Sequence, residues 1–202
     1  MKLHLSGGEP LIQDSIFYRL SLLEHHFEDV GITTNGTMIK KRIDEIDKLS
    51  RRVNFNISLD TISVKVFNDI TKKDMLKEVI EGIDLILKNG LNCKINTVVL
   101  KKTIKEIQDI LKFAKDRDII VKFLDLISDD KNEITSTKEI YCLLSAMFNI
   151  EKTTVTEGDT DYICNGSKVR LQNRLYGEFC NNCNKFPCGE GYFCIRVFGN
   201  GV

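Results

Sequence analysis

Two glycines and a glutamate follow a short predicted strand, and their types and spacing suit the binding of a small molecule. Residues 3–6 alternate between leucine and a polar residue, which is the period of a strand with one apolar face. The strand runs directly into Gly7, Gly8 and Glu9. Glycine lets a ligand approach the main chain closely, and a glutamate can pair with a cation. A tight strand-to-helix turn with a solvated glutamate is the alternative interpretation.

Polar side chains share one face of two later predicted strands. The strand at 53–60 alternates strictly, and its polar positions are Asn54, Asn56, Ser58 and Asp60. The strand at 92–100 carries Lys94 on the corresponding face. Buried polar groups without partners cost about 1–3 kcal/mol each, so this pattern predicts a cavity that holds water or a ligand. A sheet face open to solvent is the alternative.

Five strand–helix units position these residues. Strands are predicted at 3–6, 30–34, 53–60, 92–100 and 119–127, and helices at 15–27, 43–49, two stretches between 61 and 89, 103–117 and 136–148. The predicted helix caps are Asp14, Asp74, Thr103 with Glu106, and Ser136 with Glu139. Units of roughly 25–30 residues are the size of a βα repeat, and their long crossovers suit parallel strands. The sequence therefore predicts an α/β sheet or barrel.

Composition narrows the class of protein. A chain of 202 residues that is 42% hydrophobic suits one domain with a substantial core. The 29 basic residues balance 29 acidic ones, so charge does not predict capture of nucleic acid or of an anionic membrane. No apolar run is long enough to span a bilayer and no signal-peptide pattern is present, so we expect a cytoplasmic protein.

Four stretches at successive strand ends together resemble the radical S-adenosylmethionine (SAM) superfamily. They are residues 6–10 (SGGEP), 33–36 (TTNG), 56–60 (NISLD), and 94–96 (KIN) with 98–99 (VV). The similarity is strongest to the branch that contains the GTP cyclase of molybdenum-cofactor biosynthesis. It implies a partial (β/α)6 TIM-like barrel over residues 1–127, without its first strand and with ligands in its lumen. A cysteine-rich C-terminal extension over 128–202 would follow.

The resemblance implies a SAM site and a substrate site inside the barrel. The implied SAM-contacting positions are Gly7, Gly8, Glu9, Asn56, Ser58 and Ile127. The glycine pair and the glutamate would hold the amino group of the methionine moiety. The serine, with the asparagine beside it, would bond the ribose or carboxylate region, and the isoleucine would contact adenine through its backbone. Local hydrogen bonding to the backbone is the alternative role of the serine.

Thr33 and Lys94 match positions that contact the nucleotide substrate in the cyclase. A lysine inside a cavity needs an anion to offset its desolvation, and an ion pair with Asp60 or Asp125 is the alternative to a ligand. For Thr33, the alternative is again a bond to the backbone.

Three positions depart from the cyclase pattern, because His4, Lys185 and Pro187 stand where the cyclase has arginines. Arginine suits phosphate through its planar fork, so these departures leave the substrate open between a nucleotide such as GTP and a peptide.

The defining cysteines of the superfamily, C-x3-C-x2-C, are absent from this sequence. Its seven cysteines stand at 93, 142, 164, 180, 183, 188 and 194, and no three of them have that spacing. The missing motif would lie upstream of residue 1, so the chain is interpreted as a fragment or as a degenerate relative. SAM-binding residues have little use without a cluster, which favours a fragment. We expect the chain as given to be unable to cleave SAM reductively.

Four cysteines near the end of the chain are candidate metal ligands: Cys180, Cys183, Cys188 and Cys194. In a reducing compartment, such clustering predicts metal before disulfides. The first two match a C-x2-C pair that holds a second four-iron cluster in the cyclase, and the other two are extra. A C-x2-C pair suits an auxiliary iron–sulfur cluster or zinc, with unmetallated thiols as a third reading. Cys93 and Cys142 are predicted to pack in the core.

Three functions remain in competition at this point. The intact enzyme would cleave SAM to abstract a substrate hydrogen, with an electron donor as partner and GTP as substrate. A peptide- or protein-modifying relative with an auxiliary cluster is the second reading, and a non-catalytic SAM- or metal-binding module is the third. An open sheet edge beside the first strand also predicts self-association.

Overall fold

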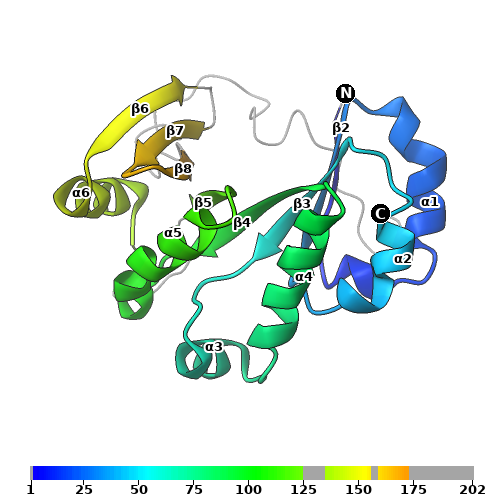
Figure 1. The fold of residues 1–202 in the computed structure, drawn as a ribbon, viewed down its shortest axis with the longest axis horizontal. Coiled ribbons are helices and arrows are strands. Elements are labelled where there is room, and N and C mark those ends of the chain that lie inside the picture. Colours follow the sequence, from blue (N-terminus) through cyan, green and yellow to red (C-terminus); the bar gives the residue numbers. More distant parts are fainter. Residues whose placement is uncertain (1, 125–134, 156–158, 173–202) are drawn as a thin grey trace, which may run out of the picture.

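The computed structural model describes residues 2–124, 135–155 and 159–172, and their strands form one open sheet flanked by helices (Figure 1). The eight strands have the order β1-β2-β3-β4-β5-β8-β7-β6. Their bounds are β1 Lys2–Leu5, β2 Asp29–Thr34, β3 Val53–Ser58, β4 Asn92–Val98, β5 Ile120–Leu124, β6 Ile150–Val155, β7 Asp159–Cys164 and β8 Ser167–Gln172. The helices are α1 Ile16–Leu23, α2 Ile43–Ile46, α3 Val64–Thr71, α4 Leu76–Lys88, α5 Ile107–Lys115 and α6 Thr137–Met147. Short 3-10 helices span η1 Pro10–Ile12, η2 Glu24–His26, η3 Lys40–Arg42 and η4 Lys101–Glu106.

Strands β1 to β5 are parallel and follow one another across the sheet, as the strand–helix alternation predicts. Helices α4 and α5 lie on the same side of the sheet in Figure 1. The predicted α/β architecture of a partial barrel is confirmed, and the sheet does not close, because β1 and β6 are its two edges. No helix in the described ranges is long and apolar enough to cross a bilayer.

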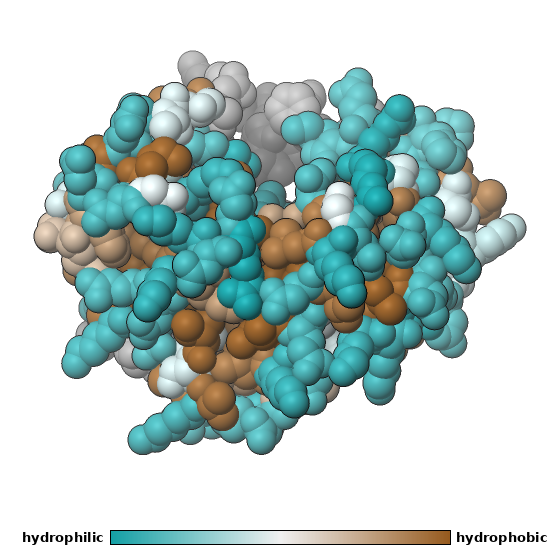
Figure 2. Space-filling model, viewed as in Figure 1, coloured by the Kyte–Doolittle hydropathy of each residue, from teal (hydrophilic) through white to brown (hydrophobic). Residues whose placement is uncertain are grey.

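Alternation along the strands separates a core face from a polar face. Val53, Phe55 and Ile57 of β3 have no exposed surface and pack in the main hydrophobic core. Their neighbours Asn54 and Asn56 point to the other side of the sheet. This second side, with the polar side chains it carries on β1 to β5 and β8, is called the lumen face below. Figure 2 shows the helix-covered exterior, where hydrophilic side chains surround smaller apolar areas.

The sheet continues beyond β5 in a way that the sequence reading did not predict. Strand β8 pairs parallel to β5, and β7 and β6 then extend the sheet as antiparallel neighbours. The turn between β7 and β8 is Asn165-Gly166, and both residues have positive φ, 48° and 86°. Asn-Gly with two positive φ angles is the preferred chemistry of a two-residue hairpin turn. The described part of the predicted extension thus joins the barrel sheet, and the division at residue 127 stays a prediction.

Two of the predicted aspartate caps are wrong. Helix α1 has Ser15 at its N-cap, and Asp14 instead accepts a hydrogen bond from Arg42 Nη1 at 3.1 Å. An exposed carboxylate beside a guanidinium has a charged donor, which competes with backbone N–H groups. Helix α4 begins after Met75, with no side-chain cap from Asp74.

Of the other two predicted caps, the one at Ser136 is confirmed and the one at Thr103 is wrong. Ser136 and Glu139 form the predicted reciprocal capping box at the start of α6. Thr103 is not an N-cap: it lies inside η4, whose N-cap is Leu100, and its Oγ1 accepts from the N–H of Leu100 at 3.0 Å. Its predicted partner Glu106 instead accepts from Thr61 Oγ1 at 2.7 Å, and α5 begins one residue later.

Candidate functional site

The glycine pair after β1 leaves open space above its backbone. Gly7 and Gly8 have φ of 90° and 40°, a region that side-chain-bearing residues rarely adopt. A Cβ added at either position would meet no atom within 4 Å. The glycines are therefore required by the turn and not by close packing, and the space above them can admit a ligand.

The carboxylate of Glu9 ties the ends of β1 and β2 together. Its Oε1 accepts from Thr34 Oγ1 at 2.6 Å and from the N–H of Leu11 at 3.1 Å, and its Oε2 accepts from the N–H of Asn35 at 2.8 Å. A carboxylate has about four lone-pair sites, so three protein donors leave about one for a ligand cation. Glu9 is thus a structural residue of this edge whatever it binds.

A polar cavity of about 440 Å³ lies against the lumen face. Its lining includes His4, Asn54, Asn56, Asn92, Lys94 and Arg170. They come from β1, β3, β4 and β8, which the sheet order brings together although residues 4 and 170 are far apart in sequence. The predicted cavity on the polar side of the strands is present, and its lining combines three amides and three cations with the carboxylates of Asp29 and Asp118.

His4, Thr33 and Asn56 form a hydrogen-bonded row across β1, β2 and β3. His4 Nε2 lies 2.8 Å from Thr33 Oγ1, and Asn56 Nδ2 donates to the same oxygen at 3.4 Å. Gly31 makes this possible, because a Cβ there would lie 2.7 Å from His4 Nδ1. Burial lowers the pKa of His4 and nearby Lys94 lowers it further, so the neutral imidazole is favoured.

Lys94 lies beside this row and forms no ion pair within the described residues. Burial lowers the pKa of Lys94, and the nearby cations Lys122 and Arg170 act in the same direction. The predicted alternative partner Asp60 accepts a hydrogen bond from the N–H of Val98 at 2.8 Å instead. The other alternative, at position 125, lies outside the described residues. Asp159 and Asp29 raise the pKa of Lys94 but form no ion pair with it in the described part of the chain, and a half-buried cation of this kind suits an anionic or carbonyl-bearing ligand.

Two ion pairs at the β8 side of the lumen face were missed by the sequence reading. Lys122 Nζ lies 2.9 Å from Asp159 Oδ1, and Arg170 binds Asp161 through two bonds of 2.6 and 2.8 Å. The aspartates come from β7, which the sequence reading left unassigned. The signal was available, because residues 159–172 alternate and contain the Asn-Gly turn.

The remaining predicted site residues are placed as follows. Ser58 is exposed at the C-terminal end of β3. Ile127 and the four candidate ligands Cys180, Cys183, Cys188 and Cys194 lie outside the described residues, as do Lys185 and Pro187.

Three cysteines are described. Cys93 packs against the core as predicted, and burial raises the pKa of its thiol to about 12. Cys142 is exposed, so the prediction that it packs in the core is wrong. It lies on α6 with its side chain open to solvent. Cys164, which the sequence could not place, is fully buried.

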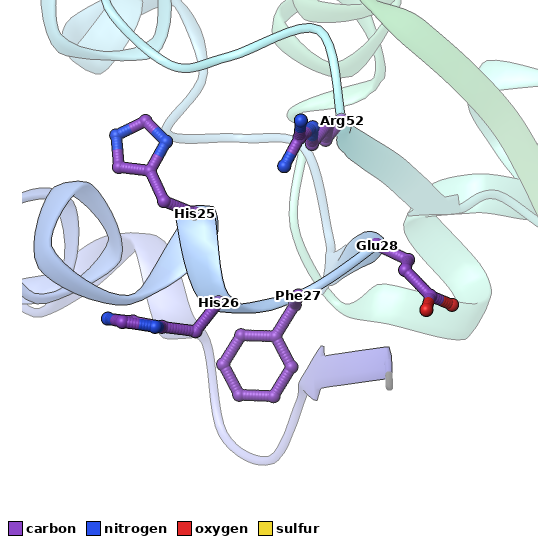
Figure 3. Close-up of a pocket in the computed structure, with 5 residues that line it drawn as sticks. All are labelled: His25, His26, Phe27, Glu28 and Arg52. Atoms are coloured by element: carbon purple, nitrogen blue, oxygen red, sulfur yellow. The ribbon is translucent and has the colours of Figure 1, made fainter.

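A second, shallower pocket of about 350 Å³ lies near the N-terminal ends of β2 and β3 (Figure 3). His25, His26, Phe27, Glu28 and Arg52 line it, and the two imidazoles point away from each other. Across the part of the chain that the structure describes, no three His, Cys, Asp or Glu residues are grouped as a metal site. We therefore place the candidate functional site in the lumen cavity and not in this pocket.

The family follows from a comparison that agrees with this geometry. The model of the Radical SAM superfamily matches residues 2–114 of the 202, which is more than half of the chain. The chain belongs to the radical SAM superfamily, and the resemblance drawn from its strand-end motifs is confirmed.

Individual relatives sharpen this assignment. The chain is 31% identical to a GTP 3',8-cyclase of Helicobacter pylori over 98% of the chain and 64% of that protein. It is 35% identical to a GTP 3',8-cyclase of Nautilia profundicola over 98% of the chain and 65% of that protein. The chain thus spans a little under two thirds of the length of these relatives. Streptococcus suis SuiB bound to S-adenosylmethionine shares the fold, with a TM-score of 0.57 and 20% identity over 72% of the chain and 35% of SuiB.

Membership of the superfamily implies SAM and a four-iron cluster. The open backbone at Gly7 and Gly8 fits SAM, because a side chain at either position would project into the space a ligand needs. The described residues do not fit the cluster. Cys93 and Cys164 are buried thiols whose pKa values burial raises, and a cluster ligand must be a thiolate.

Proposed function

We propose that this chain forms the SAM- and GTP-binding barrel of a GTP 3',8-cyclase of molybdenum-cofactor biosynthesis. The observation that carries the proposal is the half-buried Lys94, which lines a polar cavity without an ion pair in the described residues, at a position that matches a substrate contact of the cyclase. The similarity to GTP 3',8-cyclases over nearly the whole chain supports the same function.

The proposed SAM site lies at the C-terminal ends of β1 to β3. Gly7 and Gly8 would hold the methionine moiety through their backbone, and Glu9 would use its remaining lone pair for the ammonium group. Ser58 would bond the ribose or carboxylate region, and Ile127 would contact adenine through its backbone. Bound SAM supplies the hydrogen-abstracting chemistry, and this chain supplies orientation and a site from which water is excluded.

The proposed substrate site occupies the lumen cavity. Thr33 would offer its hydroxyl and Lys94 its ammonium group to GTP. A ligand oxygen bound by Lys94 would replace the hydration that burial removes, so binding and the relief of desolvation act together.

Cytoplasmic location, an external electron donor and an auxiliary cluster or zinc at Cys180, Cys183, Cys188 and Cys194 belong to the same proposal. The peptide-modifying reading rests on the cysteine tail, and nothing in the described residues favours it.

Calorimetric titration of the whole chain with GTP and, separately, with SAM tests the proposal. Lys94→Ala should weaken GTP binding by about tenfold or more, because hydrogen bonds to charged groups contribute about 1.5–3 kcal/mol. The affinity for SAM should stay unchanged. Lys65→Ala, an exposed lysine on α3, is the matched control and should bind both ligands like wild type. Absence of GTP binding by wild type, or equal affinity in Lys94→Ala, would contradict the proposal.

A further inference from the structure

Four cations gather on the part of the lumen face that β4, β5 and β8 form. They are Lys94, Lys122, Lys168 and Arg170. In the sheet register, Lys122 stands directly opposite Arg170; burial lowers the pKa of Lys94, and these two charges lower it further. Like charges this close repel one another, so the group is unfavourable unless anions of the protein or of a ligand lie beside it.

The protein supplies anions for three of the four cations. The ion pairs of Lys122 and Arg170 with β7 are described above, and Lys168 Nζ lies 2.7 Å from Asp118 Oδ1. Lys94 has no such ion pair in the described ranges. The group therefore keeps one charge that a ligand anion can balance.

The acidic side chains of the cavity lining do not provide this anion. Asp118 is engaged by Lys168, and its side chain is 82% exposed. Asp29 stands at the start of β2, accepts a hydrogen bond from the amide of Asn54, and forms no ion pair with a described lysine. The lining residues that β4 and β8 contribute include three cations and no acid. This wall of the cavity thus favours an anionic group.

The guanidinium of Arg170 is only partly used by the protein. Asp161 binds one edge of it, through Nε and Nη2. An arginine has five N–H groups, and the other three form no hydrogen bond within the part of the chain that the structure describes. The bidentate pair fixes the plane of the guanidinium, and the side chain is 28% exposed where it lines the cavity. A fixed donor group that a ligand can reach loses little entropy on binding an anion.

We propose that Arg170 is a further ligand-binding residue of this site and takes a phosphate group of the substrate through the N–H groups that Asp161 leaves open. Lys94 offers its ammonium group to the same phosphate chain from β4. The planar fork of an arginine matches the oxygens of a phosphate group better than a lysine does. The naming of the ligand as GTP rests on the proposed function, whereas the binding of phosphate rests on the side chains described here.

Calorimetric titration of the whole chain with inorganic triphosphate, with GTP and with SAM tests the role of Arg170. Arg170→Ala should weaken the binding of inorganic triphosphate and of GTP by about tenfold or more, the usual effect of losing a hydrogen bond to a charged group. The affinity for SAM should stay unchanged, because the anion that Arg170 binds belongs to the phosphate chain and not to the methionine carboxylate. Arg19→Ala, an exposed arginine on α1, is the matched control and should bind all three ligands like wild type.

Two further variants separate ligand binding from the ion pair. Arg170→Ala leaves the half-buried carboxylate of Asp161 without its partner, which costs stability. Arg170→Gln combined with Asp161→Asn removes both charges and keeps side chains of similar size. Arg170→Lys keeps a cation beside Asp161 but lacks the planar fork. Both variants should stay folded in thermal melts and bind inorganic triphosphate more weakly than wild type does. Wild-type affinity in both would overturn the inference.

The outcomes distinguish this inference from the proposed function. Binding of GTP by wild type with unchanged affinity in Arg170→Ala would overturn the role of Arg170 alone, as would a loss confined to SAM. Wild type that binds GTP but not inorganic triphosphate would also overturn it, because the phosphate chain would then not be recognised. Binding of triphosphate that depends on Arg170, without binding of GTP, would overturn the proposed function and leave the phosphate site standing. Absence of binding for both ligands would overturn both.

Discussion

On β3, Phe55 and Ile57 point into the helix-covered core with no exposed surface, whereas their neighbours Asn54 and Asn56 face the lumen cavity. The core face carries apolar side chains, which are stabilised by packing against one another and need no hydrogen-bond partners. The lumen face holds amides and cations whose hydrogen-bonding capacity the protein only partly uses. The comparison teaches that consecutive residues of one strand serve stability and ligand binding separately, so substitutions on the core face should lower stability far more than substitutions on the lumen face.

The largest effect is expected on the core face. Phe55→Ala should lower the free energy of unfolding by about 3–5 kcal/mol, because it removes a fully buried ring and leaves a cavity. Urea denaturation followed by circular dichroism measures this. Asn54→Ala, one residue earlier on the other face, is the matched control and should cost much less. Equal losses in the two variants would refute the division between the faces.

Two glycines with positive φ extend the comparison to the ends of the strands. Gly36→Ala should cost about 2 kcal/mol, since its φ is 80° and the new Cβ would lie 3.2 Å from Ile57 and Val79 side-chain atoms. Gly8→Ala should cost only about 1 kcal/mol, because its φ of 40° is strained but the space around it is open. Thermal denaturation ranks the two variants. A larger loss at Gly8 would show that protein atoms and not a ligand fill that space.

Removing the lumen cation should have the opposite sign to removing core side chains. Lys94→Met should raise the free energy of unfolding by about 0.5 kcal/mol, because it eliminates a desolvated charge near Lys122 and Arg170. Urea midpoints for wild type and variant give the change. Lys65→Met at an exposed site should leave the midpoint unaltered. A clear loss of stability in Lys94→Met would mean that the lysine has a structural partner.

The smallest effect is a pH dependence that originates at His4. Its pKa in the folded chain lies below the ordinary 6.5, so on acidification the unfolded chain takes up this proton first. Stability should therefore fall as the pH drops through 6.5, and His4→Gln should flatten this part of the profile. Unfolding curves between about pH 7.5 and about pH 5.5 test this. Coinciding profiles for wild type and His4→Gln would show that the imidazole titrates normally.

Periodicity alone was enough to predict the faces of β3 and β4. A strand has a period of two, so the alternation of Phe55 with Asn54 and Asn56 fixes which side chains share a side. The glycine pair was also identifiable, because its position at a strand end does not depend on distant residues. The caps at Asp14 and Asp74 were not predictable in this way, since a tertiary partner such as Arg42 competes with the local backbone.

The part of the site that sequence reasoning missed comes from β7 and β8. Asp161 meets Arg170 because the Asn165-Gly166 turn sets the register of that hairpin. The strand beside which this hairpin packs is decided by long-range tertiary contacts, and local sequence patterns do not predict it. The pairing of Lys122 with Asp159 follows from the docking of β8 beside β5. Lys94, by contrast, gains no such ion pair from β7 or β8 in the described residues.

The contribution of Glu9 to cofactor affinity is difficult to measure by mutagenesis, because its carboxylate also has a structural role. The three hydrogen bonds that Glu9 accepts join the C-terminal ends of β1 and β2. Glu9→Gln therefore weakens this connection between the strands as well as removing a charge. Thr34→Val breaks one of those bonds and leaves the acid in place. The affinity lost in Glu9→Gln beyond that lost in Thr34→Val is then the quantity that reports on the ammonium group itself.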